Sequence, residues 1–168
     1  IAACPWASGV SGMAKLVMNE EETMLADMAR GFLDDACPVS KLREMRDAGV
    51  TSDAATWKEM ADLGWAGVLV PEEAGGSDMG FAAANVIAHE MGKTLAVSPF
   101  ISSAVIAATA LRQVNDARAL GALAKIASGD VTYALAVDEG IKFDPEGVQM
   151  EAKADGNGFR LNGKKQFV

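Results

Sequence analysis

The stretch that decides the fold of this chain reads Gly64-Trp65-Ala66-Gly67-Val68-Leu69-Val70-Pro71-Glu72-Glu73-Ala74-Gly75-Gly76-Ser77-Asp78. An aromatic and aliphatic segment leads into a proline, turns through two glycines and precedes a long run of periodic apolar residues. Gly75 and Gly76 permit positive φ angles and a close approach of backbone that a bulkier residue would resist. The sequence therefore predicts a tight loop that leads into a helix, with Ser77 or Asp78 at its N-cap. The alternative interpretation is an ordinary connecting loop between two buried segments.

The helix predicted after this loop extends to about Leu95. Its apolar residues recur at spacings of three, four, seven and eight, which places them on one face. The residues expected on that buried face are Met79, Ala82, Ala83, Val86, Ile87 and Met91.

The first helix of the chain is predicted from a capping box, in which Asn19 pairs with Glu22 three residues later. Pro38 ends this helix, because proline lacks the N–H that a helix interior needs. Its buried stripe is expected to contain Leu25, Met28, Ala29, Phe32 and Leu33.

Two further helices are predicted before the decisive loop. Ser40 is expected to cap a short helix that ends near Gly49, and Gly64 is expected to close the next one. That second helix starts at one of three candidate caps and buries an apolar face. The candidate caps are Thr51, Ser52 and Asp53, and the buried residues are Trp57, Met60 and Ala61.

Two helices are predicted after Leu95. Ser98 caps the first, with Pro99 in its first turn, and the helix runs from Phe100 to about Leu111. It is apolar almost all round, so we expect it in the centre of the domain. Asn115 is expected to cap the second, which ends at Gly129 and carries Leu120, Leu123 and Ile126.

The hydrophobic period changes after Gly129. Residues 131–137 form a β-prone run, and strands are predicted around 148–152 and 158–168. Asp155-Gly156-Asn157-Gly158 is a strong hairpin turn signal. The fold class is therefore α+β: an all-α, up-and-down helical domain over residues 13–129, then the first strands of a β-barrel-like domain over 130–168. Residues 1–12 are interpreted as a tag or an unstructured leader.

The composition excludes several classes of function. A net charge of -8 argues against nucleic acids and anionic membrane surfaces, which would repel the chain. Two cysteines, Cys4 and Cys37, do not make a disulfide framework and suit the reducing cytoplasm. No apolar run is long enough to predict a membrane span.

Few residues predict chemistry by themselves. His89 is the only histidine and has no serine or cysteine nucleophile near it in sequence, so a catalytic role is not expected. One histidine and two distant cysteines do not supply a zinc site, and no glycine-rich phosphate motif is present. The nine methionines suit either a core or a flexible apolar binding surface.

Two motifs in this chain resemble the acyl-CoA dehydrogenase family. The first is Pro71-Glu72-Glu73-x-Gly75-Gly76, followed by a helix that contains His89-Glu90-Met91-Gly92-Lys93. The second is the segment 158–168, Gly-Phe-Arg-Leu-Asn-Gly-Lys-Lys-Gln-Phe-Val, which is similar to the Leu-Asn-Gly-x-Lys hairpin of the family. The motifs have the order and separation seen in the family, and the likeness covers roughly residues 16–168.

The resemblance implies the amino-terminal part of a FAD-dependent enzyme that desaturates an acyl-CoA thioester at the α,β position. It also implies electron transfer to a separate flavoprotein carrier and a homo- or hetero-oligomer. The catalytic base of the family would lie beyond Val168, so we expect this chain alone to be inactive. A monooxygenase or oxidase of the same fold, and a non-catalytic partner subunit of a heteromeric dehydrogenase, remain alternatives.

The flavin contacts that the resemblance implies are Tyr133, Val137, Asp138 and Phe167. Asp138 replaces a hydroxyl residue of the family loop and Gly140 replaces its proline, whereas Glu139 matches. An ionised aspartate only accepts hydrogen bonds, so this loop departs from the family pattern. Phe167 stands where relatives place an aromatic residue on the flavin ring, although it also suits an ordinary strand position.

The acyl-tail pocket that the resemblance implies lies along the helix after Gly76. Phe81, Ala84 and Asn85 would approach the acyl chain, and the bulky Phe81 would shorten the cavity. Ordinary helix packing is the alternative for Ala84.

Overall fold

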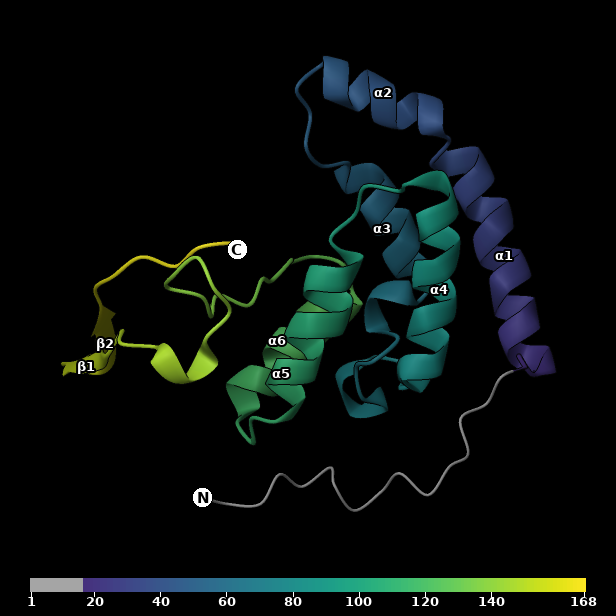
Figure 1. Cartoon of the computed structure of the whole chain (residues 1–168). Helices are drawn as coiled ribbons and strands as arrows, with labels where there is room; N and C mark the ends of the chain where they lie inside the picture. Colours follow the sequence, from purple (N-terminus) through teal and green to yellow (C-terminus); the bar gives the residue numbers. More distant parts are fainter. Residues whose placement is uncertain (1–16) are drawn as a thin grey trace.

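The computed structural model describes residues 17–168 (Figure 1). A helical body comes first along the chain, followed by an extended segment and one β-hairpin. The longer elements are α1 (Glu20–Ala36), α2 (Val39–Asp47), α3 (Ala54–Asp62), α4 (Gly80–Thr94), the π-helix η4 (Phe100–Ala107), α5 (Ala108–Arg112), α6 (Ala117–Ala127), β1 (Ala152–Asp155) and β2 (Gly158–Leu161). This arrangement confirms the predicted α+β class.

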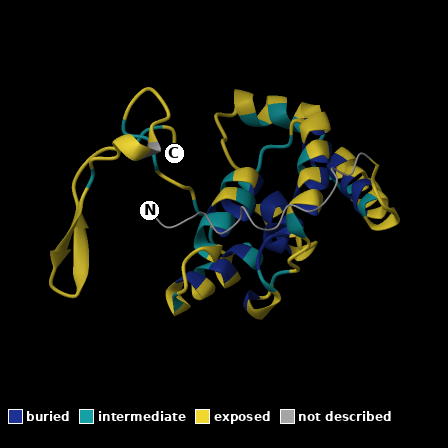
Figure 2. Cartoon of the chain, turned by 60° about the horizontal axis from the view of Figure 1, so that its bottom comes forward, coloured by how far each residue is buried: buried dark blue, intermediate teal, exposed yellow. Residues whose placement is uncertain are grey.

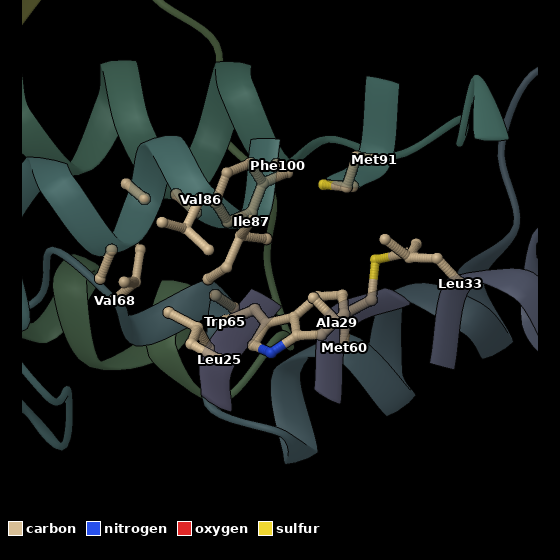
Figure 3. Close-up of a cluster of buried hydrophobic side chains, with 14 of the residues drawn as sticks. Leu25, Ala29, Leu33, Met60, Trp65, Val68, Val86, Ile87, Met91 and Phe100 are labelled. Carbon is tan, nitrogen blue, oxygen red and sulfur yellow. The ribbon is translucent and has the colours of Figure 1, made fainter. Parts of the chain in front are cut away.

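The main core lies where α1, α3 and α4 meet the segment that follows Gly64 (Figure 3). Trp65 is 1% exposed, and its ring meets the ring of Phe32 edge to face, with 5.3 Å between the centroids. Of the residues predicted for the buried face of α4, Ala83, Val86, Ile87 and Met91 are buried, but Met79 and Ala82 are exposed. The stretch 64–78 contributes Trp65, Val68 and Leu69 to this core, where all three are buried.

A second core cluster joins the loop after Pro71 to the end of the helical body. It contains Val70, Ala74, Ala107, Ala108, Leu123 and Ile126. Gly75 has a positive φ of 79°, as the loop prediction allows. Gly76 does not, but a Cβ built there would overlap the Val70 carbonyl. The two glycines thus serve different purposes, one for the turn and one for the close approach of backbone.

The predicted caps of α1 and α3 are confirmed. The Asn19 side chain accepts from the Glu22 N–H at 2.7 Å, and the Glu22 carboxylate accepts from the Asn19 N–H at 2.8 Å. Of the three candidates for α3, Asp53 is the cap, because its carboxylate accepts from the Thr56 N–H at 3.1 Å. Gly64 follows α3 with a left-handed φ of 83°, which closes that helix.

Two predicted caps are wrong by one or two residues. Ser40 lies inside α2, whose N-cap is Pro38. Asp116 and not Asn115 caps α6, because its carboxylate accepts from the Arg118 N–H at 2.7 Å. For α6 two adjacent polar side chains were available, and sequence spacing alone does not choose between them, whereas α2 begins without a side-chain cap.

The predicted cap of α4 is also wrong, because neither Ser77 nor Asp78 accepts from the first turn of the helix. The backbone N–H groups of Ser77, Asp78 and Met79 instead donate to carbonyls of residues 67–70. The Asp78 carboxylate accepts a hydrogen bond from the Arg112 guanidinium at 2.6 Å. Arg112 also donates to the Leu69 carbonyl at 2.8 Å. The loop is therefore fixed to the preceding segment and to α5.

The helix predicted from Phe100 to Leu111 is present, but its first eight residues form a π-helix. The Ser98 hydroxyl accepts from the Phe100 N–H at 3.3 Å, and Pro99 precedes the helix instead of occupying its first turn. One face of this helix is buried through Phe100, Ser103 and Ala107, whereas Ile101 and Ile106 are exposed. The helix is therefore central on one side only.

The β part is smaller than predicted. Residues 131–138 belong to neither a helix nor a strand. The hairpin pairs Ala152 with Leu161 and Asp155 with Gly158, around a turn at Gly156 and Asn157. The turn prediction is thus confirmed, but β1 lies at 152–155 instead of around 148–152, and β2 ends at Leu161 instead of reaching Val168. All eight strand residues are exposed, as Figure 2 shows.

Candidate functional site

Three segments that are distant in sequence meet at Glu139. Its carboxylate accepts from the backbone N–H of Gln149 at 2.8 Å and from that of Met150 at 3.0 Å. It also receives the ammonium group of Lys165 at 2.7 Å. The Lys165 and Glu139 side chains are only 17% and 22% exposed, so this ion pair is partly shielded from water. The three hydrogen bonds join the segment after α6 to both ends of the hairpin.

The segment that ends the chain is also bonded directly to residues 137–139. Lys165 donates to the Val137 carbonyl at 3.0 Å, and the Gln166 backbone N–H donates to the Asp138 carbonyl at 2.8 Å. The Gln166 side chain donates to the Glu139 carbonyl at 3.1 Å. We call this set of contacts the Glu139–Lys165 clamp.

The charges of the clamp are matched. Hydrogen bonds from Lys165, and then from the Gln149 and Met150 amides, lower the pKa of Glu139 to about 2. Glu139 is therefore ionised at neutral pH and neutralised by Lys165. Asp138 next to it is different, because its Oδ1 atom is buried without a hydrogen-bond partner. An acceptor without a donor is thus held beside a neutralised ion pair.

Three of the four predicted flavin contacts come together at this clamp. Val137 and Asp138 lie on one segment, and Phe167 directly follows Gln166, which is bonded to that segment. The Phe167 ring is 74% exposed, and its backbone has a φ of 55°, which non-glycine residues rarely adopt. Phe167 is therefore not a core strand residue within the described part of the chain.

Tyr133 is not part of this group. Its backbone N–H donates to the hydroxyl of Ser103, a buried residue of the π-helix, at 3.1 Å. The half-buried Tyr133 side chain packs against the second core cluster. The structure thus places Tyr133 at the junction between the helical body and the extended segment.

The three predicted acyl-pocket residues do not share one environment. Phe81 is 63% exposed, and Asn85, one helical turn later, is exposed on the same face of α4. Ala84 is 3% exposed and belongs to the main core cluster. The packing alternative therefore describes Ala84, while Phe81 and Asn85 leave an open face on α4.

Two ion-pair clusters, one around Glu139 and one around Glu90, are not predicted by the sequence analysis. Glu139 was noticed only as a motif match, and Lys165 stands 26 positions away, so no local spacing links the two residues. Glu90 is 2% exposed, and its carboxylate contacts Lys93 at 2.7 Å and Arg30 at 3.3 Å. Burial alone would raise the pKa of Glu90, but the hydrogen bonds from Lys93 and Arg30 hold it below the ordinary value. The spacing of three residues between Glu90 and Lys93 on one helix is the sequence signal that could have predicted this ion pair.

Metal-binding clusters and membrane-spanning helices are absent from residues 17–168. No group of three histidine, cysteine or carboxylate side chains there could hold a metal ion. None of the helices in that range has the length and apolarity to cross a bilayer. His89 is 60% exposed beside Glu90, and Cys37 is a buried free thiol whose pKa is raised by burial.

A family model described as "Acyl-CoA dehydrogenase, N-terminal domain" matches residues 19–130. This match covers most of the chain and the whole helical body. The chain therefore belongs to the acyl-CoA dehydrogenase family.

Similar proteins agree with this assignment. Acyl-CoA dehydrogenase FadE27 of Mycobacterium tuberculosis is 26% identical over 145 residues, which is 86% of this chain and 38% of that protein. A variant of the Tcur3481-Tcur3483 steroid ACAD is 32% identical, with a TM-score of 0.75 over 88% of this chain and 40% of that one. The ChsE4-ChsE5 complex from Mycobacterium tuberculosis is 25% identical, with a TM-score of 0.75 over 89% and 40%. The chain thus spans about two fifths of the length of these relatives.

Proposed function

We propose that this chain is the amino-terminal part of a FAD-dependent acyl-CoA dehydrogenase that introduces an α,β double bond into an acyl-CoA thioester. The observation that carries the proposal is the meeting of Asp138 and Phe167 at the Glu139–Lys165 clamp. Family membership supports it, because the second motif of the family ends at this place in the chain.

The residues at the clamp fit a flavin. The exposed Phe167 ring offers an apolar face on which an isoalloxazine can stack. The buried Oδ1 of Asp138 needs a donor, and the pyrimidine edge of an oxidised flavin presents one ring N–H. We expect Val137 to add apolar contact beside them. Bound FAD would supply the acceptor for the hydride that leaves the substrate.

The open face of α4 is the part of the proposed substrate site that this chain supplies. Phe81 and Asn85 are exposed there, so a side chain can be changed without disturbing the core. Phe81→Ala should raise kcat/KM for longer acyl chains relative to shorter ones, since each extra buried methylene is worth about 0.8 kcal/mol. His89→Ala, at an exposed position of the same helix outside the proposed pocket, is the control. A chain-length profile of full-length enzyme that does not move with Phe81→Ala would contradict this role.

The base that removes the α-proton is expected outside this chain, on the part that the relatives have beyond the match. The proposed electron acceptor is an electron-transfer flavoprotein or a similar carrier. We propose the cytoplasm as the compartment, a choice supported by the free thiol at Cys37. We also propose a homo- or hetero-oligomer, which the similarity to the ChsE4-ChsE5 complex supports.

A second candidate function is a subunit of a heteromeric dehydrogenase for a bulky steroid-like acyl-CoA. The similarity to the Tcur3481-Tcur3483 steroid ACAD supports this candidate, since its 32% identity exceeds the values for FadE27 and ChsE4-ChsE5. The departure of Asp138 and Gly140 from the family loop also suits a subunit specialised within a pair. One version of this candidate is a non-catalytic partner subunit that binds no FAD and contributes only to assembly of the heteromeric enzyme.

The experiment is anaerobic turnover of the purified full-length protein with straight-chain and steroid-side-chain acyl-CoA. Formation of the 2,3-enoyl-CoA with an artificial electron acceptor supports a dehydrogenase, and the substrate range separates the two candidates. Turnover that requires oxygen would instead indicate a monooxygenase or oxidase. A protein without flavin that copurifies with a flavin-containing subunit would indicate the assembly role.

A further inference from the structure

We propose that Glu139 and Lys165 are positioning residues that fix the distance between the Asp138 acceptor and the Phe167 ring, and thereby set the geometry of the bound flavin. The inference rests on the proposed function, because it requires that the protein binds FAD. Neither residue is assigned to touch the cofactor. They act through the segments that they hold.

The first argument is the connectivity of the clamp. The Glu139 carboxylate is the point where residues 137–139, 149–150 and 165–166 meet, through three hydrogen bonds of 2.7–3.0 Å. Within the described residues, the other bonds between 137–139 and 165–166 come from Lys165 and Gln166. Loss of the Glu139 side chain therefore releases residues 149–150 and leaves Lys165 without its carboxylate, so that only bonds to the backbone carbonyls of residues 137–139 still hold the segment that carries Phe167.

The second argument is that nothing else in the described chain fixes Phe167. Its ring is 74% exposed, and the only ordered β-structure nearby is a hairpin whose residues are all exposed. In Figure 1 the hairpin lies apart from the helical body. A core therefore does not hold this ring in place, and the clamp is the interaction that can.

The third argument is electrostatic. Asp138 presents an unpartnered buried oxygen directly beside Glu139. If Glu139 were not neutralised, its negative charge would lie next to the Asp138 carboxyl group and would oppose binding of any further negative charge there. Lys165 removes one of these charges at 2.7 Å. The pairing leaves Asp138 free to accept from a ligand.

The test compares Glu139→Gln and Lys165→Gln with Arg160→Gln in the full-length protein. Arg160 forms an ion pair with Asp155 at 2.6 Å in the same hairpin, but both side chains are mostly exposed and lie outside the clamp. This control removes a cation of similar reach without touching residues 137–139. Thermal unfolding of each flavin-free protein reports any general loss of stability.

The readouts are the FAD dissociation constant and the visible circular dichroism of the bound flavin at saturating FAD. Loss of charge-assisted hydrogen bonds should weaken FAD binding by roughly tenfold to a hundredfold in both clamp variants. The dichroism should also change in sign or shape, because the ring geometry changes. Arg160→Gln should match the wild type in both measurements.

Unchanged affinity and dichroism in the clamp variants, with or without a lower melting temperature, would overturn the positioning role while the proposed function stands. A wild-type protein that binds no FAD would overturn the proposed function, and the positioning role with it. The two failures are therefore separated by the behaviour of the wild type.

Discussion

Gly76 shows most clearly how one residue fixes the local fold. A methyl group at this position would meet the backbone of Val70, which cannot move away as a flexible side chain could. We expect Gly76→Ala to lower the free energy of unfolding by roughly 1–3 kcal/mol. Urea denaturation of the chain measures this quantity directly.

Gly31→Ala is the matched control for Gly76→Ala. Gly31 lies on the exposed side of α1 with open space around its Cα, so alanine should stabilise the chain by up to about 1 kcal/mol. Equal effects of the two substitutions would show that Gly76 is a spacer and not a position of close backbone approach.

Asp138 gives a second prediction at this scale. A carboxylate near a flavin ring disfavours the anionic reduced form, so Asp138→Asn should raise the reduction potential of bound FAD. An interaction of about 1–2 kcal/mol corresponds to roughly 20–40 mV for a two-electron couple. Spectroelectrochemical titration of the full-length protein measures the shift. A potential that is unchanged would place the carboxylate away from the ring.

Residue-level features were predicted well where the signal was local. The Asn19–Glu22 capping box follows from a spacing of three residues and is present, and Asp53 is one of the three candidate caps named for α3. Ser77 was a wrong choice because α4 begins only at Gly80, after a loop whose N–H groups bond to residues about ten positions away. The Glu139–Lys165 pair could not be predicted for the same reason, since sequence distance hides it.

The clamp makes a prediction at the scale of elements, through its pH dependence. The pKa of Glu139 falls from an ordinary value of 4.5 to about 2 in the folded chain. Because the folded pKa is depressed, the clamp contributes its full stabilisation above about pH 4.5, and this contribution is lost as the pH falls toward 2. Residues 149–150 should then separate from Glu139, while residues 165–166 keep their bonds to the carbonyls of residues 137–139.

The NMR shifts of the Gln149 and Met150 amides report this opening, because both donate to Glu139. Both should titrate together with a midpoint near pH 2, and Glu139→Gln should abolish the titration. Amide shifts that move with an ordinary glutamate midpoint would mean that the clamp is not formed.

Elements were predictable to different degrees for a physical reason. The helices are local structures whose apolar period can be read directly, and α4 illustrates this because Ala83, Val86, Ile87 and Met91 are buried as predicted. The run 131–137 has the composition of a strand, but a strand also needs a partner, and no described residues pair with it. The π-helix at Phe100–Ala107 has no sequence signal that we recognise.

At the scale of the whole molecule, the chain contains a helical body with a packed core and a β-hairpin without one. The helical body has two buried clusters, whereas β1 and β2 bury nothing and each keeps one edge unpaired among the described residues. A two-stranded hairpin is marginal in water without a covering layer. We therefore expect the flavin site to need the rest of the protein, although Phe167 and Asp138 belong to this chain.

The most direct test of this account is the flavin content and anaerobic bleaching of two preparations, the full-length protein and residues 1–168 alone. The full-length protein should be yellow, and its flavin absorbance should fall when an acyl-CoA is added without oxygen. Residues 1–168 should hold almost no FAD, because one aromatic stack adds only about 0.5–1.5 kcal/mol beyond burial against association costs of about 4–15 kcal/mol. A full-length protein whose flavin no acyl-CoA reduces, or a stoichiometrically flavin-loaded 168-residue chain that bleaches, would contradict the account.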